Sequence, residues 1–146
     1  PLDDYLREIV AKWRAMRPEV SMTAQFRGTE PVPCIVSEQT LSQAITSILN
    51  NAADASPQSV EVNGAWSDVE LLLEIADRGP GLAPAVRARV GASVVTTKGE
   101  GLGLGLFLAH TTLHRLGGRV ALAPRAGGGT LCRLTLPLAP LRVTGP

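Results

Sequence analysis

Two glycine clusters, with one acidic residue ahead of them, are the part of the sequence best suited to chemistry. The first is Asp77-Arg78-Gly79-Pro80-Gly81, and the second is Gly101-Leu102-Gly103-Leu104-Gly105-Leu106. Glycines at alternate positions let the backbone approach a phosphate chain closely. A helix that begins straight after them turns unpaired N–H groups and its positive dipole end toward such anions. Each cluster alone is equally typical of a loop, but together they suggest a nucleotide pocket.

A polar stripe on a predicted helix supplies a third motif. Ser47, Asn51 and Asp54 stand at positions i, i+4 and i+7, so they share one side of a helix beside its apolar face. An amide oxygen is a suitable ligand for Mg²⁺, which keeps several waters and takes one or two protein ligands beside nucleotide phosphates. Asn51 suits that role. Taken alone, Asn50 and Asn51 also fit solvated helix positions, and Asp77 fits a turn cap at a strand end.

The composition describes a globular domain without a general attraction for polyanions. The chain has 146 residues, of which 45% are hydrophobic and 18% are charged. We therefore expect one α/β domain with a buried core. A formal net charge of +1 provides no broad field for nucleic acid or an anionic membrane. We expect no nucleic-acid partner and no direct membrane contact by this domain.

The cysteines and the chain ends indicate the setting. Cys34 and Cys132 have no Cys or His neighbour at metal spacing, so neither a zinc site nor a disulfide scaffold is indicated, and a reducing compartment fits. No signal peptide pattern is present, and no apolar run approaches the roughly 18 residues that span a bilayer. Because the chain opens on Pro1, we expect a fragment of a longer protein.

Helical periodicity occurs in three segments. Apolar residues recur at this spacing over 2–16, 41–52 and 104–116. Ser37 is predicted to cap the start of the second helix, and Gly117-Gly118 to cap the end of the third.

Alternating patterns predict strands between these helices. They cover 20–26, 60–66, 69–75, 120–123 and 131–136, with turns at Arg27-Gly28-Thr29, Ser67-Asp68 and Arg125 to Gly129. Residues 80–100 lack a sustained period and predict a mobile lid with at most one short helix over 85–90. This order predicts a two-layer α/β sandwich, with a mixed, largely antiparallel sheet and helices on one face.

Five short segments resemble, in order and spacing, the N, G1, lid, G2 and G3 boxes of the histidine kinase ATP-binding domain. They are Ser47-Ile48-Leu49-Asn50-Asn51-Ala52 with Asp54, Asp77 to Gly81, Thr96-Thr97-Lys98, Gly101 to Leu106, and Gly128-Gly129-Thr130. The resemblance covers residues 1–138 and leaves 139–146 as a loose tail. Leu106-Phe107-Leu108-Ala109-His110 is most similar to the RegB/PrrB type of redox-responsive sensor kinase.

The resemblance implies the Bergerat ATP-binding fold, which gyrase and MutL share, with ATP and Mg²⁺ as cofactors. Asp77 would accept a hydrogen bond from the adenine amino group, Thr130 would support that contact, and Asn51 would bind Mg²⁺. Lys98 could neutralise phosphate charge. The implied ATP-binding residues are Asp77, Gly79, Gly81, Lys98, Gly101, Leu102, Gly103, Leu104, Gly105, Thr130 and Asp54.

Three positions depart from the family pattern. Ser47 replaces the first asparagine of the N box, where hydrolytic relatives carry a glutamate that activates water, and this favours a kinase over an ATPase. Asp54 stands where many kinases have a basic residue, and we expect it to act behind the direct ligands or to reach Mg²⁺ through water. Val94-Val95 replaces the aromatic anchor of the lid, which predicts looser lid packing.

No phosphoacceptor box is visible in the chain. His110 and His114 are expected to serve packing or surface contacts, since a metal pair there lacks a third ligand. The resemblance places the acceptor histidine on a helical dimerisation hairpin elsewhere in the protein, with a response regulator as the next acceptor. Cys34 and Cys132 are expected to be structural, with Cys132 facing inward.

The predicted function is that of the catalytic ATP-binding domain of a sensor histidine kinase, cytoplasmic and part of a membrane-anchored sensor. Alone, it should bind Mg²⁺-ATP but turn over little. One alternative is a Ser/Thr kinase of the anti-sigma type with the same fold, which phosphoserine on a partner would reveal. Another is a non-catalytic interaction module, which would fail to bind ATP.

Overall fold

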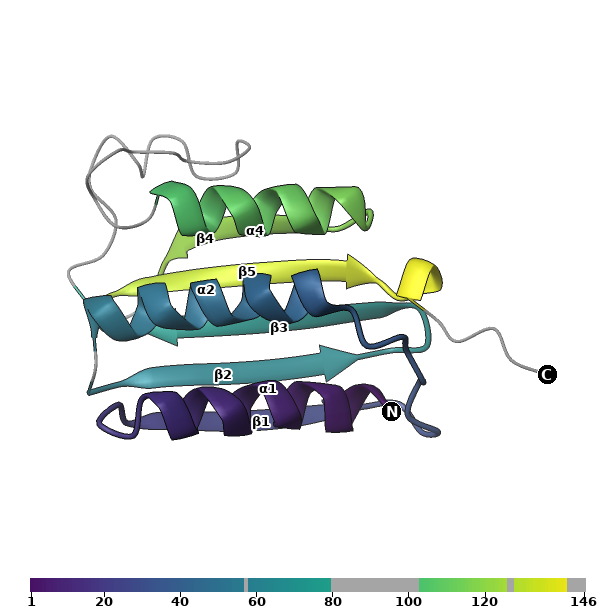
Figure 1. The fold of residues 1–146 in the computed structure, drawn as a ribbon, viewed down its shortest axis with the longest axis horizontal. Helices are drawn as coiled ribbons and strands as arrows, with labels where there is room; N and C mark the ends of the chain where they lie inside the picture. Colours follow the sequence, from purple (N-terminus) through teal and green to yellow (C-terminus); the bar gives the residue numbers. More distant parts are fainter. Residues whose placement is uncertain (57, 80–102, 126–127, 142–146) are drawn as a thin grey trace.

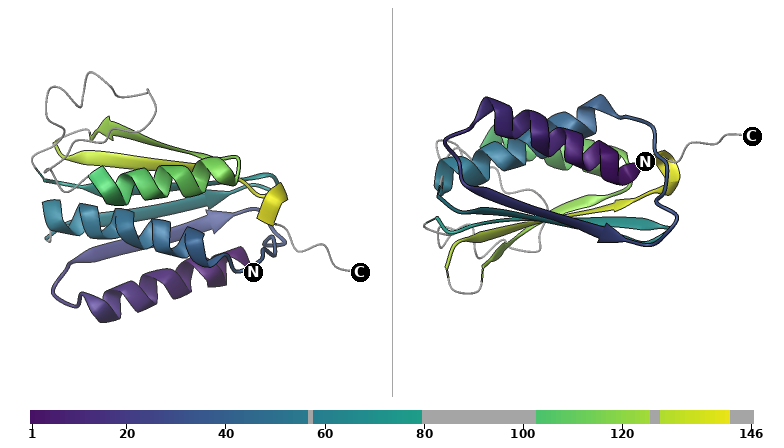
Figure 2. Two further views of the ribbon diagram at one scale, coloured as in Figure 1. Left: turned by 45° about the horizontal axis from the view of Figure 1, so that its top comes forward. Right: turned by 90° about the horizontal axis from the view of Figure 1, so that it is seen from below.

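Helices α1 (Leu2–Met16), α2 (Gln39–Ala55) and α4 (Gly103–Arg115) lie on one face of a sheet, as Figures 1 and 2 show. In this computed structural model, residues 1–56, 58–79, 103–125 and 128–141 are described, with only the backbone given for residues 103–107. The predicted lid at 80–100 and its short helix lie outside these ranges.

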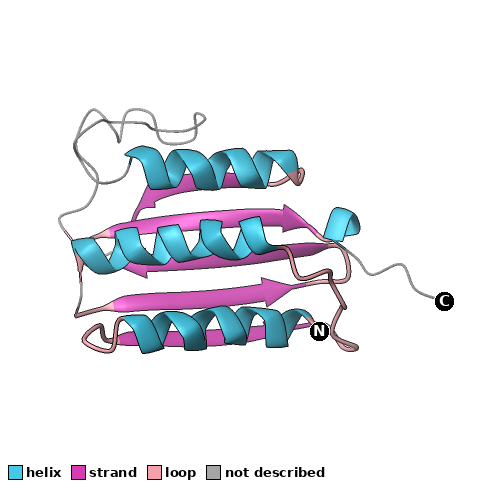
Figure 3. Ribbon diagram, in the orientation of Figure 1, coloured by secondary structure: helices cyan, strands magenta, loops and turns pink. Residues whose placement is uncertain are grey.

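The described strands form one five-stranded sheet (Figure 3). Along the chain they are β1 (Met22–Gly28), β2 (Val60–Trp66), β3 (Glu70–Asp77), β4 (Arg119–Pro124) and β5 (Thr130–Pro137). Their order in the sheet is β1-β2-β3-β5-β4. Strand β1 runs parallel to β2, and the other neighbours are antiparallel. The predicted α/β sandwich with a mixed, largely antiparallel sheet is therefore confirmed.

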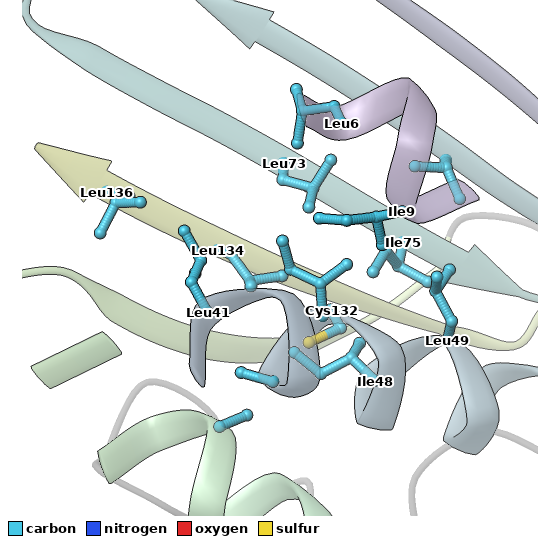
Figure 4. Packing of buried hydrophobic residues seen from close by; sticks show 14 of the residues in the cluster. Leu6, Ile9, Leu41, Ile48, Leu49, Leu73, Ile75, Cys132, Leu134 and Leu136 are labelled. Carbon is cyan, nitrogen blue, oxygen red and sulfur yellow. The ribbon is translucent and has the colours of Figure 1, made fainter. Parts of the chain in front are cut away.

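The core fills the space between the helices and the sheet (Figure 4). Leu49 of α2 is fully buried, and Ile75 of β3 is 1% exposed. Cys132 lies in the same layer, as its phase on β5 predicts. Because alternate residues of each strand point at the helices, β3 enters the core with one face and delivers its last residue, Asp77, to the helix side.

The helix ends agree with the predictions at one site and differ at another. Gly117 has a φ of +84°, and Gly118 N–H donates to Leu113 O at 2.7 Å, which is a Schellman ending of α4 as predicted. The cap of α2 is Glu38 rather than Ser37, since the Glu38 carboxylate accepts from Thr40 N–H. Tyr5 Oη fixes the Glu38 backbone by donating to its carbonyl oxygen at 2.6 Å.

The structure differs from the predicted limits at the end of β1 and at the start of the C-terminal tail. Strand β1 continues through Gly28, where the sequence predicts a turn, because Gly28 pairs with Trp66 and leaves room for its indole ring. The start of the predicted loose tail is ordered. Residues Ala139–Leu141 form a 3₁₀ turn, Leu141 is buried, and its carbonyl accepts from Val36 N–H at 2.7 Å.

Candidate functional site

A buried carboxylate lies at the end of β3. Asp77 is 7% exposed, and Gly79 N–H donates to its Oδ1 at 2.8 Å. The Thr130 backbone N–H also faces the Asp77 carboxylate and acts to lower its pKa. Two backbone N–H groups from different segments of the chain therefore face one carboxylate, which is the arrangement needed for an acceptor of fixed direction.

The environment of Asp77 opposes its ionisation. Burial raises the pKa of Asp77 above its ordinary value, while hydrogen bonds from Gly79 and Thr130 and the positive charge of Arg125 act in the opposite direction. An ionised Asp77 therefore destabilises the domain, and an additional hydrogen-bond donor to its carboxylate would reduce that cost.

This shift predicts a pH-dependent stability difference between the wild type and Asp77→Asn. When the pKa of an Asp is higher in the folded state than in the unfolded state, the folded protein loses stability as the pH rises from the unfolded-state pKa through the folded-state pKa. As the pH rises above about 4, the ordinary pKa of an Asp side chain, the melting temperature of Asp77→Asn should therefore rise relative to that of the wild type. Thermal melts across this range measure the difference, with the exposed Asp68→Asn as control. A difference independent of pH would contradict the assignment.

The turn after Asp77 packs directly against helix α2. A Cβ at Gly79 would lie 2.8 Å from both the Cβ and the carbonyl oxygen of Ala55. Only glycine fits this approach without a shift of the backbone. The close contact places the Asp77 loop beside the end of the helix that carries Asn51.

The turn before β5 packs against Asp77 from the other side. Gly129 has a φ of +104°, and a Cβ there would lie 1.9 Å from the Asp77 carbonyl oxygen. Gly129 is thus required both by its backbone conformation and by the space available. The structure brings together the predicted residues Asp77, Gly79 and Thr130.

Adjacent asparagines on α2 have different surroundings. Asn50 Oδ1 accepts from Trp13 Nε1 at 3.0 Å and from Arg17 at 3.4 Å, so Asn50 ties α2 to α1. Asn51 is half-buried, and its Nδ2 has no hydrogen-bond partner within the described part of the chain. A buried amide nitrogen without a hydrogen-bond partner is expected where a side chain binds a ligand.

Asp54 has a partner that sequence reasoning missed. Its Oδ1 lies 3.0 Å from Arg17 Nη1, and its side chain is 69% exposed. Arg17 follows α1 and also reaches Asn50, so it connects the two helices. Asp54 thus contributes to the α1–α2 contact, and its expected role near Mg²⁺ stays a prediction.

The second glycine cluster is described in part. The described part of helix α4 starts at Gly103, so Gly103, Leu104 and Gly105 belong to its first described turn, and their predicted contact with phosphate stays a prediction. Gly81, Lys98, Gly101 and Leu102 lie outside the described residues, and their predicted roles stay predictions.

The histidines and cysteines occupy other parts of the fold. The His110 and His114 rings stack with centroids 5.9 Å apart on α4. Burial, and secondarily His114, lowers the pKa of His110. Burial raises the pKa of Cys132 to about 12, which keeps its thiol protonated and unreactive. Cys34 is exposed rather than part of the core.

Sequence reasoning missed an ion pair beside this site. Arg125, in the turn between β4 and β5, binds Glu61 of β2. The Arg125 side chain is only 11% exposed. The two residues stand 64 positions apart in sequence, and no local pattern predicts that they meet.

Comparison with known proteins identifies the class of domain. Residues 36–140 match the family of histidine kinase-, DNA gyrase B- and HSP90-like ATPases. Sensor histidine kinase RegB of Cereibacter sphaeroides is 30% identical over 139 residues, covering 86% of this chain. The chain spans only 30% of the RegB length.

Solved structures support the same fold. Full-length ShkA in complex with AMPPNP is similar with a TM-score of 0.71 at 24% identity, over 100% of this chain and 31% of that one. Histidine kinase ThkA in complex with the response regulator TrrA gives a TM-score of 0.71 at 15% identity, over 95% of this chain and 41% of that one. At these identities the likeness concerns the fold alone.

The chain belongs to the family of histidine kinase-, DNA gyrase B- and HSP90-like ATPases. Within it, the chain is an ATP-binding catalytic domain of the two-component sensor histidine kinase type. The resemblance to that type, including RegB, is thereby confirmed. Among the described residues, no helix has the length and apolar character needed to cross a membrane.

Proposed function

We propose that the domain holds Mg²⁺-ATP between the Asp77 loop, helix α2 and the start of α4, and presents the γ-phosphate to a histidine on another domain of the same protein. The observation that carries this proposal is the buried Asp77 carboxylate, which accepts from Gly79 N–H and faces the N–H of Thr130. That geometry supports an acceptor for the adenine amino group.

The charge of Asp77 supports discrimination between purines. Adenine offers an amino group at the position where guanine has a carbonyl oxygen. A buried carboxylate facing that oxygen receives no hydrogen bond from the base, so two acceptors oppose each other at a cost on the order of a few kcal/mol. The pocket is therefore expected to favour ATP over GTP strongly.

The residues on α2 fit a magnesium ion. The unpaired amide of Asn51 is a neutral group with a hard oxygen, and turning the amide by 180° presents its oxygen where Nδ2 stands. Asn51 would hold the ion together with phosphate oxygens. When bound, Mg²⁺ would neutralise phosphate charge.

Ser47 supports phosphotransfer rather than hydrolysis. It lies one helical turn before Asn51 on α2, and its hydroxyl is too weak a base to activate water at neutral pH. A carboxylate at this position would serve that purpose. The reaction then depends on a stronger nucleophile, the imidazole of the acceptor histidine, brought by another domain.

The expected partners follow from the separation of the ATP-binding domain from the domain that carries the acceptor histidine. We infer that the acceptor is a helical dimerisation domain, and that a response regulator receives the phosphoryl group, consistent with the ThkA–TrrA complex. The domain would work in the cytoplasm as part of a membrane-anchored sensor. Its net charge of +1 gives no reason to expect direct contact with lipid.

Phosphotransfer in the full-length protein tests this proposal. Incubation with γ-labelled ATP should give an acid-labile, base-stable phosphohistidine, and Asp77→Asn should abolish it. Phosphoserine on a partner would instead establish the Ser/Thr kinase alternative. If the folded domain bound no ATP, the non-catalytic alternative would replace the proposal.

A further inference from the structure

The turn that supports Asp77 is closed by Arg125. Arg125 N–H donates to Gly129 O, and Gly128 N–H donates to Arg125 O, both at 3.0 Å. Gly129 lies against the Asp77 backbone, and the Thr130 N–H faces the Asp77 carboxylate. A displacement of Arg125 would therefore also move Gly129 and Thr130, the two residues of this turn that lie next to Asp77.

The Arg125 side chain is fixed on the face of the sheet away from the helices. Val60 and Val62 face the core, so Glu61 between them points to the opposite face. Glu61 pairs with Ala76 of β3, the residue before Asp77. The Arg125–Glu61 pair thus joins the β4–β5 turn to β2, across the strand that ends in Asp77.

Removal of either charge would disturb this arrangement. The Arg125 side chain is 11% exposed, and its Nη1 has no partner among the described residues. Within the described part of the chain, Glu61 is the only residue that forms an ion pair with Arg125. A mostly buried guanidinium without its carboxylate would move toward water, and the turn would move with it.

We propose that the Arg125–Glu61 ion pair is a positioning pair for adenine recognition, holding the Gly129–Thr130 turn against Asp77 from the far face of the sheet. The proposal rests on the proposed contact between Asp77 and the adenine amino group. Neither side chain contacts the nucleotide in this account. Their effect passes through the backbone of the turn.

The chain offers a matched control pair. Glu74 and Arg133 stand opposite each other on β3 and β5 and form an ion pair at 2.8 Å. They lie on the same face of the sheet as Glu61, because Glu74 alternates with the buried Leu73 and Ile75. Arg133 is 51% exposed and belongs to no turn at the site. Glu74→Gln therefore removes a similar charge pair without disturbing Asp77.

Calorimetric titration with ATP and GTP tests the pair in Glu61→Gln, Arg125→Met and the double variant. Each single variant should weaken ATP binding by about tenfold and reduce the ATP-over-GTP preference, and the double variant should lose no more than either single one. Glu74→Gln should change ATP affinity less than about twofold.

The outcomes separate this proposal from the one on which it rests. Equal effects of Glu61→Gln and Glu74→Gln would overturn the positioning role, as would a lower melting temperature with unchanged ATP affinity, or additive losses in the double variant. If Asp77→Asn left ATP binding intact, the adenine contact itself would be wrong. Loss of binding in Asp77→Asn alone would preserve that contact and refute only the positioning pair.

Discussion

Asp77→Asn should lower ATP affinity by about 100-fold while leaving the domain at least as stable as the wild type at neutral pH. The carboxylate accepts from Gly79 N–H and faces the Thr130 N–H, and we propose that its remaining lone pairs accept from the adenine amino group. In the variant, the amide oxygen can replace one acceptor, but the NH₂ group would face the adenine amino group. Two donors then oppose each other in a buried site.

The separation of binding from stability makes this prediction informative. Calorimetry gives the dissociation constant, and thermal melting without nucleotide gives the stability. Since burial raises the pKa of Asp77, loss of the charge should not harm the ligand-free fold. A variant that melts well below the wild type at neutral pH would show that Asp77 has a structural role instead.

Gly129→Ala should destabilise the domain by about 3 kcal/mol or more and abolish measurable ATP binding in whatever fraction remains folded. A methyl group there would lie 1.9 Å from the Asp77 carbonyl oxygen and 2.8 Å from Arg78 Cα. Both obstacles are backbone atoms, so a side-chain rotation cannot relieve the clash. The turn has to move away, and it takes the Thr130 N–H with it.

Gly128→Ala provides the matched control. Gly128 has a φ of +109°, close to that of Gly129, but a Cβ there meets nothing within 4 Å. Alanine at this position therefore carries only the backbone cost, about 1 kcal/mol, and ATP binding should persist. Urea denaturation compares the two variants. Similar losses in both would show that conformation, rather than the contact with Asp77, makes Gly129 necessary.

Periodicity was sufficient to predict most of the fold. The spacing of apolar residues in α2 and their alternation in β3 depend on which face is buried, and both patterns are local. The cap of α2 was displaced from Ser37 to Glu38 because Tyr5 holds the Glu38 backbone, a contact between residues 33 positions apart. The 3₁₀ turn ending at Leu141 was missed for the same reason, since its partner is Val36.

The candidate site was predictable where the signal was chemical and local. Asp77, Gly79 and Thr130 belong to short motifs, and the structure brings them together. The long-range side-chain contacts around these motifs were not predictable. The Arg17–Asp54 and Arg125–Glu61 contacts each join distant segments through long side chains. Many alternative pairings of charges are compatible with the same sequence, and only the fold selects among them.

In the function we propose, Asp77 accepts a hydrogen bond from the adenine amino group of a bound Mg²⁺-nucleotide. The most direct test of this contact is a calorimetric titration of the wild-type domain with ATP and with GTP, each with and without Mg²⁺. We expect saturable ATP binding that Mg²⁺ strengthens, and GTP binding weaker by about 100-fold. Equal affinity for the two nucleotides, or no binding by the folded domain, would contradict it.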